Sequence, residues 1–309
     1  MPRKVIIDCD PGQDDALAIV LALAASDEIA VEAISTVSGN VPVDLTYRNA
    51  IWISRFCNAP DIPVYRGAAR PLIADPKYAY EFHGDEGISG IPGPAPDIDE
   101  TPVGASHGLS RILMDSDEKV TIVATGPLTN LAILLLEFPC VAEKIDEILI
   151  MGGAYAEHGN VSPAAEFNWF VDPHSVQHVL RAPVPKKIFS LDVTHQVCAT
   201  RKTAQEFGAL GNCAGELYRH SVEQLIGINE KFYGVHSTPC HDVMPIVYLL
   251  APDLFDIESG SVAICTDLGP FQGAVALDRG GRRGGDLNAD WVTNARSDRV
   301  FETILSRLR

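Results

Sequence analysis

Short, uninterrupted apolar runs alternate with helical patterns through most of the chain. The runs Val5–Ile7 and Val31–Val37 read as strands, and they are followed by helical patterns at 14–25 and 45–56. Strands that are apolar at every position are buried on both faces, as in parallel sheets whose crossover helices cover both sides. The chain is therefore predicted to be an α/β protein. Its central sheet should be open, Rossmann-like and mostly parallel, with helices on both faces.

The same alternation continues to the end of the chain. Further strands are expected at 120–124, 145–151 and 187–191, helices at 128–138, 173–181, 200–209, 214–228, 240–250 and 298–308, and a late hairpin from 262–265 and 273–277. Segments 68–100 and 152–168 fit no regular element, and long irregular loops in compact domains are often functional. No linker-like run divides the chain, so residues 1–309 are predicted to form one domain. Its ligand should bind at the carboxyl ends of the strands.

Four aspartates surround the end of the first predicted strand. Asp8 and Asp10 share one strand face, and after a Pro-Gly turn Asp14 and Asp15 open the following helix. Four carboxylates at one turn repel one another unless a hard cation binds them, and oxygen ligands favour calcium or magnesium. A purely structural interpretation, in which acids favour a helix start, accounts for two of the four at most.

A second chemistry also begins with a strand followed by Asp-x-Asp. In phosphatases of that type the first aspartate is the nucleophile and the second an acid/base, which would give those roles to Asp8 and Asp10. The expected Gly and Thr or Val do not follow, because the chain continues Pro11-Gly12-Gln13. A D-x-D phosphatase therefore stays as the alternative, together with a non-catalytic sugar-binding protein.

Charge and cysteine usage restrict the partners. The chain carries 41 acidic and 24 basic residues, a formal net charge of −17, which disfavours nucleic acid polymers and anionic membranes. The longest apolar run, 16–25, is too short to span a bilayer. The seven cysteines are scattered and no signal peptide is visible, which indicates a reducing, cytoplasmic location. A neutral small molecule is the expected ligand.

The run Ile7–Ala16 resembles the N-terminal signature of the nucleoside hydrolases, in particular the inosine–uridine preferring group. Further matching motifs follow in the family's order: Gly39-Asn40, Thr125–Asn130, Met151–Gly153, Gly159-Asn160, Ala165–Asn168, Val171–Pro173 and His241-Asp242. The resemblance runs from residue 5 to about residue 250.

This resemblance implies a calcium-dependent enzyme of nucleoside salvage. It would hydrolyse the N-glycosidic bond of uridine, inosine or cytidine to give ribose and free base. The calcium ligands implied are Asp10, Asp15, Asp242 and the main-chain carbonyl of Thr125. The substrate-binding residues implied are Asp14, Asn160, Glu166 and Asn168 for the ribose hydroxyls, Met151 for the sugar pocket and Asn40 as a support. Asp10 would also take the proton of the attacking water. Family members usually assemble as homodimers or homotetramers.

Histidines are the candidates for work on the leaving base. His241 precedes the implied ligand Asp242, and a histidine with a near-neutral pKa suits proton donation to the base. An ordinary histidine at a helix start is the alternative. His83 matches a family loop beside the pocket, although it also fits a surface loop. Tyr233 is a candidate contact to the base. Purine-specific members lack the histidine, so His241 indicates the inosine–uridine or cytidine–uridine type.

Overall fold

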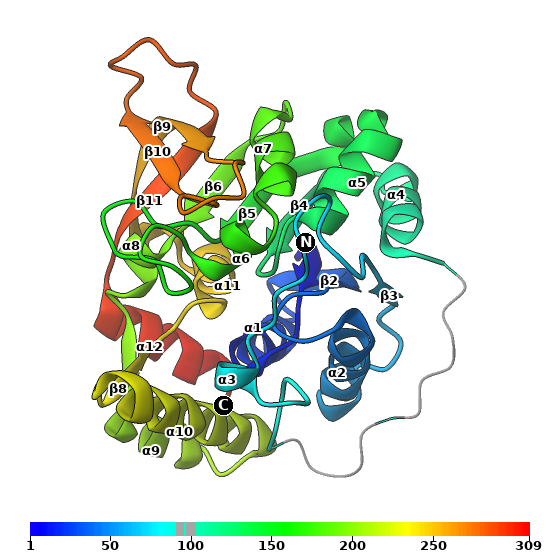
Figure 1. Ribbon diagram of the computed structural model, residues 1–309. Coiled ribbons are helices and arrows are strands. Elements are labelled where there is room, and N and C mark those ends of the chain that lie inside the picture. Colours follow the sequence, from blue (N-terminus) through cyan, green and yellow to red (C-terminus); the bar gives the residue numbers. More distant parts are fainter. Residues whose placement is uncertain (91–95, 97–102) are drawn as a thin grey trace.

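A nine-stranded mixed sheet forms the centre of the computed structural model, which describes residues 1–90, 96 and 103–309 (Figure 1). The strand order is β10-β9-β11-β6-β5-β4-β1-β2-β3. The bounds are β1 Arg3–Cys9, β2 Ile29–Thr36, β3 Val64–Arg66, β4 Val120–Ala124, β5 Ile145–Met151, β6 Lys186–Phe189, β9 Phe255–Ile264, β10 Val275–Arg279 and β11 Ala289–Ala295. A separate antiparallel pair joins β7 Cys198–Thr200 to β8 Ser237–Pro239.

Seven neighbouring strands of the large sheet, from β11 to β3, are parallel. Only β9 runs in the opposite direction, because it pairs antiparallel with both β11 and β10, and β9 and β10 form the late hairpin expected from the sequence. The chain passes from β1 outward to β2 and β3 and then returns to the other side of β1 with β4. This reversal leaves a crevice beyond the carboxyl ends of β1 and β4, where open α/β sheets bind their ligands.

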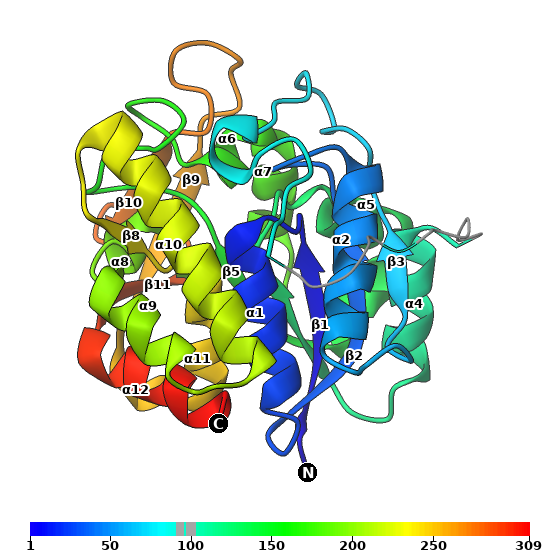
Figure 2. The same cartoon turned by 90° about the horizontal axis from the view of Figure 1, so that it is seen from below.

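Helices cover both faces of the sheet (Figure 2). Their bounds are α1 Gln13–Ala24, α2 Val43–Phe56, α3 Tyr80–His83, α4 Ala105–Asp115, α5 Thr129–Glu137, α6 Phe167–Val171, α7 Pro173–Arg181, α8 Leu191–Thr194, α9 Arg201–Gly208, α10 Cys213–Tyr233, α11 Val243–Leu250 and α12 Ser297–Arg307. Strand β1 is buried from both sides: Val5 and Ile7 pack with α1, α10 and α11, and Ile6 packs with α4, α5 and α7. This confirms the double burial predicted from the apolar runs.

The sequence patterns missed or shortened several elements. Strand β11 was not expected, because it is not a continuous apolar run. A bulge between Val292 and Asn294 also interrupts the alternation of its polar and apolar residues. Helix α10 continues to Tyr233, five residues beyond the expected end at 228. The short β3 and α3 and the helix α4 were also missed. The segment 68–100, expected to be irregular, contains α3, and its residues 91–95 and 97–100 lie outside the described part. Among the described residues, no helix is long and apolar enough to cross a membrane.

Candidate active site

The ends of β1 and β4 are fastened together at the crevice. The backbone N–H of Thr125, just after β4, donates to the carbonyl of Asp8 at 2.9 Å. Asp10 follows β1 directly, and its carboxylate lies against two close-packed turns. A Cβ added to Gly39 would stand 2.0 Å from Asp10 Oδ2, and one added to Gly126 would stand 2.6 Å from Oδ1. Only glycine at these positions leaves room for the carboxylate.

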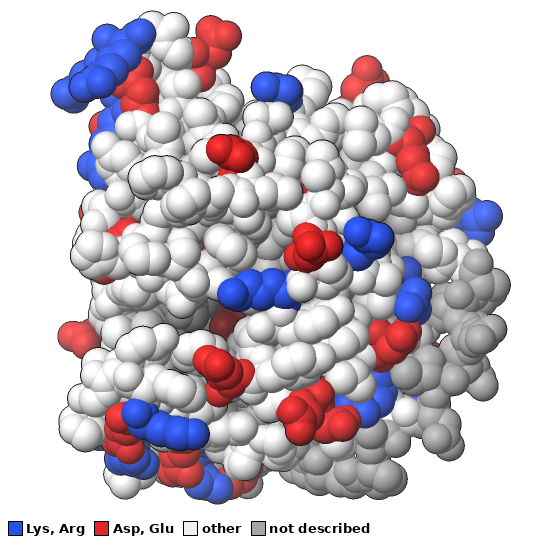
Figure 3. All heavy atoms as spheres, viewed as in Figure 1, with Lys and Arg blue, Asp and Glu red and all other residues white. Residues whose placement is uncertain are grey.

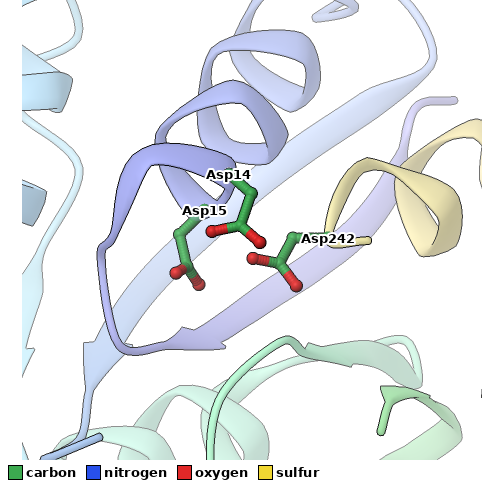
Figure 4. Close-up of side chains that lie close together, drawn as sticks. All are labelled: Asp14, Asp15 and Asp242. Atoms are coloured by element: carbon green, nitrogen blue, oxygen red, sulfur yellow. The ribbon is translucent and has the colours of Figure 1, made fainter. Parts of the chain in front are cut away.

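Three other carboxylates, those of Asp14, Asp15 and Asp242, converge from two helix starts (Figure 4). Asp14 and Asp15 stand in the first turn of α1, and Asp242 immediately precedes α11. One oxygen of each lies within 4.8 Å of the others. In the space-filling view, the face of the molecule that is turned toward the viewer in Figure 1 has a hollow, and an acidic side chain is visible deep in it (Figure 3).

Burial makes this group of acids costly in the absence of a counter-charge. It is the main cause that raises the pKa of Asp15 to about 6, with the charge of Asp14 adding to it. The pKa values of Asp10 and Asp242 lie well above their usual range, first through burial and then through the neighbouring aspartates. Each acid must therefore hold a proton or share a cation.

The donor set fits a hard divalent cation. All three converging side chains are carboxylates, and Oδ1 of Asp14 is buried without a hydrogen-bond partner. Oxygen-rich sites of this kind suit calcium or magnesium. The cluster is consistent with a metal site of the kind expected from the sequence. Asp14 belongs to it geometrically, although the sequence analysis assigned that residue to ribose.

Asp10 and Asp15 are fixed by backbone and side-chain donors. Oδ2 of Asp10 accepts from the N–H of Asn40 at 2.6 Å. Oδ2 of Asp15 accepts from the Gly12 N–H at 3.0 Å and from Nδ2 of Asn40 at 3.2 Å, while Oδ1 accepts from Oγ1 of Thr125 at 2.7 Å. Asn40 thus donates hydrogen bonds to both aspartates.

Glu166 and Asn168 approach the site from the start of α6. Glu166 caps α6 and accepts backbone N–H bonds from Asn168 and Trp169 and from Gly153, and burial raises its pKa to about 7. Nδ2 of Asn168 donates to the carbonyl of Thr125 at 2.7 Å. Asn168 Nδ2 also lies 3.7 Å from the sulfur of Met151, which is buried at the end of β5. The Thr125 carbonyl, the expected fourth ligand, therefore accepts from Asn168 in this structure.

Two histidines flank the carboxylates. Nδ1 of His241 lies 2.9 Å from Oγ1 of Thr194, a partner that no sequence motif indicated. Burial, with His195 and His83 adding to it, lowers the pKa of His241 to about 3. His83 ends α3 against α1, and burial lowers its pKa to about 4. Burial thus favours the neutral form of both rings, and the near-neutral pKa expected for His241 is not found.

Two expected contacts lie outside this buried group. Asn160 is exposed, and its Oδ1 accepts from the N–H of Phe167, so it holds the start of α6. Tyr233 is 60% exposed at the end of α10, where its ring stacks with Phe82 at 6.4 Å. Neither touches the carboxylates directly.

Asp8 occupies a different environment from Asp10. It is fully buried, and its Oδ1 accepts from Oγ of Ser35 at 2.5 Å and from Nδ2 of Asn130 at 2.7 Å. Oδ1 of Asp8 is thus taken up by residues of β2 and α5, whereas Asp10 lies among the other carboxylates of the site. The spacing along β1 alone could not reveal these partners of Asp8.

Known proteins match this chain along almost its whole length. The family model described as inosine-uridine preferring nucleoside hydrolase matches residues 5–302. A pyrimidine-specific ribonucleoside hydrolase RihA from Enterobacter sp. is 38% identical over 279 residues, which is 90% of this chain and 88% of that protein.

Solved structures with the same fold include a plant nucleoside hydrolase, PpNRh1. It has a TM-score of 0.93 and 29% identity and covers 100% of this chain and 99% of its own. A purine-preferring ribonucleoside hydrolase from Gardnerella vaginalis has a TM-score of 0.90 and 26% identity, covering 99% of this chain and 98% of its own.

Proposed function

The chain belongs to the inosine-uridine preferring nucleoside hydrolase family and is a ribonucleoside hydrolase, and we propose that it hydrolyses uridine, cytidine or inosine with calcium bound. The observation that carries the proposal is the convergence of Asp14, Asp15 and Asp242, with the charge of Asp10 close enough to raise the pKa of Asp242. Bound there, calcium would supply positive charge that polarises the attacking water and orients the sugar hydroxyls.

Asp10 is the proposed general base. Its Oδ2 is held by the Asn40 N–H at 2.6 Å, and Gly39 and Gly126 fix its position. Burial and the neighbouring carboxylates raise its pKa, and a bound cation would lower this pKa again, which leaves the carboxylate ionised and able to accept a proton. In this role Asp10 accepts the proton of the water that attacks the anomeric carbon.

Asp14, Glu166 and Asn168 are the proposed ribose-binding residues, with Asn160 and Asn40 supporting their loops and Met151 lining the sugar pocket. Cleavage of the bond passes through an oxocarbenium-like transition state, and negative or dipolar groups around the sugar stabilise its positive charge. Glu166 is pre-oriented for this by three backbone N–H groups. The Glu166 carboxylate is therefore held in one orientation by the backbone around it.

His241 is the proposed proton donor to the leaving base. It is neutral in the substrate-free protein because burial lowers its pKa. Negative charge that develops on the departing base beside the ring would raise this pKa again, since an opposite charge favours the protonated form. The ring would then take up a proton from water and pass it to the departing base as the bond breaks, so that the base leaves neutral and the ring returns to its neutral form.

The preferred base is open among the three nucleosides. The RihA relative is named pyrimidine-specific, whereas the Gardnerella structure, with the same fold, is named purine-preferring. The fold therefore does not determine the base. We propose that three residues determine which base is preferred. They are His241, His83 and the exposed Tyr233.

Two further proposals complete this assignment. A cytoplasmic role in nucleoside salvage is supported by the seven cysteines, all free. A homodimer or homotetramer is what the family resemblance predicts.

The test is an assay of free ribose released from uridine, cytidine and inosine, with phosphate release from a phosphomonoester measured beside it. Ribose release that stops in chelator and returns with calcium would support the proposal. Phosphate release without ribose release would contradict it.

A further inference from the structure

Gln13 is the first residue of α1 and stands between two aspartates of the site and a surface helix. Its side chain is fully buried. The sequence motifs gave roles to the neighbouring aspartates but none to Gln13. It lies where three parts of the chain meet: the start of α1, the segment 80–90 that carries His83, and α10.

Every polar group of Gln13 next to this junction has a partner. Its backbone N–H donates to Nδ1 of His83 at 3.1 Å. Its Nε2 donates to Oγ of Ser89 at 3.0 Å, and its Oε1 accepts from Oγ of Ser221 on α10 at 3.0 Å. One residue thus binds the histidine, the loop after it and the helix behind it.

Ser89 extends the connection to α10. Its hydroxyl donates to Oε1 of Gln224 at 2.6 Å, and Nε2 of His220 lies 3.0 Å from the same oxygen. Because the single hydroxyl proton goes to Gln224, Nε2 of His220 must be the donor in the second contact. The hydrogen bonds around Ser89 are therefore mutually consistent.

Close backbone packing leaves the segment little freedom at this junction. A Cβ on Gly90 would stand 2.2 Å from Cδ2 of His220, and one on Gly12 would stand 2.5 Å from Nδ1 of His83. On the other side, Nδ2 of Asn49 donates to the carbonyl of Glu86 at 2.8 Å. The segment is held from α2 as well as from α1 and α10.

The bond from the Gln13 backbone also fixes the tautomer of His83. Nδ1 accepts, so in the neutral ring the proton is on Nε2. Nε2–H is then the donor group of the neutral His83 ring.

We propose that Gln13 is a positioning residue, which orients His83 as an Nε2–H donor toward the substrate by fastening the segment 80–90 to α10. The inference rests on the proposed function, in which His83 lies beside the sugar or base. It assigns Gln13 no contact with the substrate.

The test compares Gln13→Met with Gln272→Met, using the full-length protein and uridine. Methionine keeps the length of the side chain and removes the amide. Gln272 is a matched control because its amide donates to the Phe170 carbonyl at 2.6 Å, away from this junction. Gln13→Met should raise KM about tenfold with a smaller change in kcat, the effect of one misplaced hydrogen bond. Gln272→Met should leave KM within about twofold.

A double-mutant cycle with His83→Ala separates positioning from a general structural role. If Gln13 acts through His83, adding Gln13→Met to His83→Ala should change KM by less than about twofold. An undiminished tenfold increase in that background, or a lowered Tm with KM unchanged in the single variant, would overturn the proposal. Should Gln13→Met fail to fold, Ser89→Ala breaks the same connection and is subject to the same criteria.

Hydrogen exchange provides a readout that needs no activity. Backbone N–H groups of residues 84–90 should exchange faster in Gln13→Met than in Gln272→Met, and equal exchange would overturn the proposal. Failure of the wild-type protein to release ribose would overturn the proposed function and with it the role of His83. The exchange measurement would then still decide whether Gln13 holds the segment.

Discussion

The two ends of the central sheet both contain buried acids, but the side chains around these acids carry different charges. Near the start of β5, Glu147 lies 3.0 Å from Arg3 and 2.5 Å from Lys187, so its charge is paired. At the carboxyl ends of β1 and β4, by contrast, no Lys or Arg nitrogen in the described part of the chain lies within ion-pair distance of Asp10 or Asp242. One end pairs its acid with basic side chains, whereas the acids of the other end are the proposed ligands of a cation and the substrate.

The largest expected effect concerns the substrate's hydroxyl groups at the carboxyl end. Glu166, Asn168 and Asp14 are proposed to bind the ribose hydroxyls, and a missing hydroxyl would leave buried polar groups unpaired. Deoxyuridine should therefore be hydrolysed about 10⁴-fold less efficiently than uridine, measured as kcat/KM. Similar values for the two nucleosides would remove the ribose assignment.

Exchanging one acid at each end sharpens the comparison directly. Asp10→Asn keeps the shape and one oxygen but cannot accept the water's proton, so kcat should fall at least about a hundredfold with no loss of stability in the metal-free protein. Glu147→Gln should keep kcat and lose about 1–3 kcal/mol of unfolding free energy, because Arg3 and Lys187 lose their partner. Steady-state assays and denaturant unfolding measure both. A catalytic loss in Glu147→Gln equal to that in Asp10→Asn would erase the distinction between the ends.

The leaving-group role of His241 predicts an effect that depends on the substrate. His241→Ala should lower hydrolysis of uridine and inosine about a hundredfold, because their bases need a proton to leave. It should spare p-nitrophenyl riboside, whose leaving group is already a stable anion. Comparing the two losses controls for damage to the fold or the metal site. Equal losses would make His241 a residue that only shapes the site, and His83 the better candidate for the acid.

The smallest expected effect is on stability as a function of pH. In the metal-free protein, burial raises the pKa of Asp15 from 3.8 to about 6 and that of Glu166 from 4.5 to about 7. The folded state binds these protons more tightly than the unfolded state. The resulting stability is present in full below about pH 4 and is lost as the pH rises through 6 and 7. Tm should therefore fall between pH 5 and pH 8, and calcium should raise Tm more at pH 8. Asp15→Asn should show a shallower fall, and an unchanged slope would contradict the cause given.

Much of the fold was predictable because its signals are local. The apolar runs of β1, β4 and β5 identified the parallel centre of the sheet, and the strand-to-helix turn at 8–15 located the site. Strand β11 gave no such signal, because it is half polar and gains its place only by pairing with β6 and β9. Helix α10 was predicted too short because Gly227, a poor helix former, interrupts its pattern, while contacts with α9 and β8 sustain it.

The site was predictable where the residues share one motif and less so where they meet through folding. Asp10, Asp14 and Asp15 lie in a single turn, and family resemblance added Asp242 from far along the chain. Thr194 beside His241 and Ser89 beside Gln13 have no mark in the sequence, since each is defined by a neighbour that only the tertiary structure supplies. The ionisation of His241 was equally out of reach, because it depends on how deeply the ring is buried.

The most direct test of the contrast between the two ends is calorimetric titration of metal-stripped protein with calcium. The account predicts one bound ion per chain, with binding strongly weakened in Asp15→Asn and in Asp242→Asn and unchanged in Glu147→Gln. Absence of calcium binding in a protein that keeps full activity in chelator would contradict it, as would binding that the Glu147→Gln change weakens as much as the two aspartate changes.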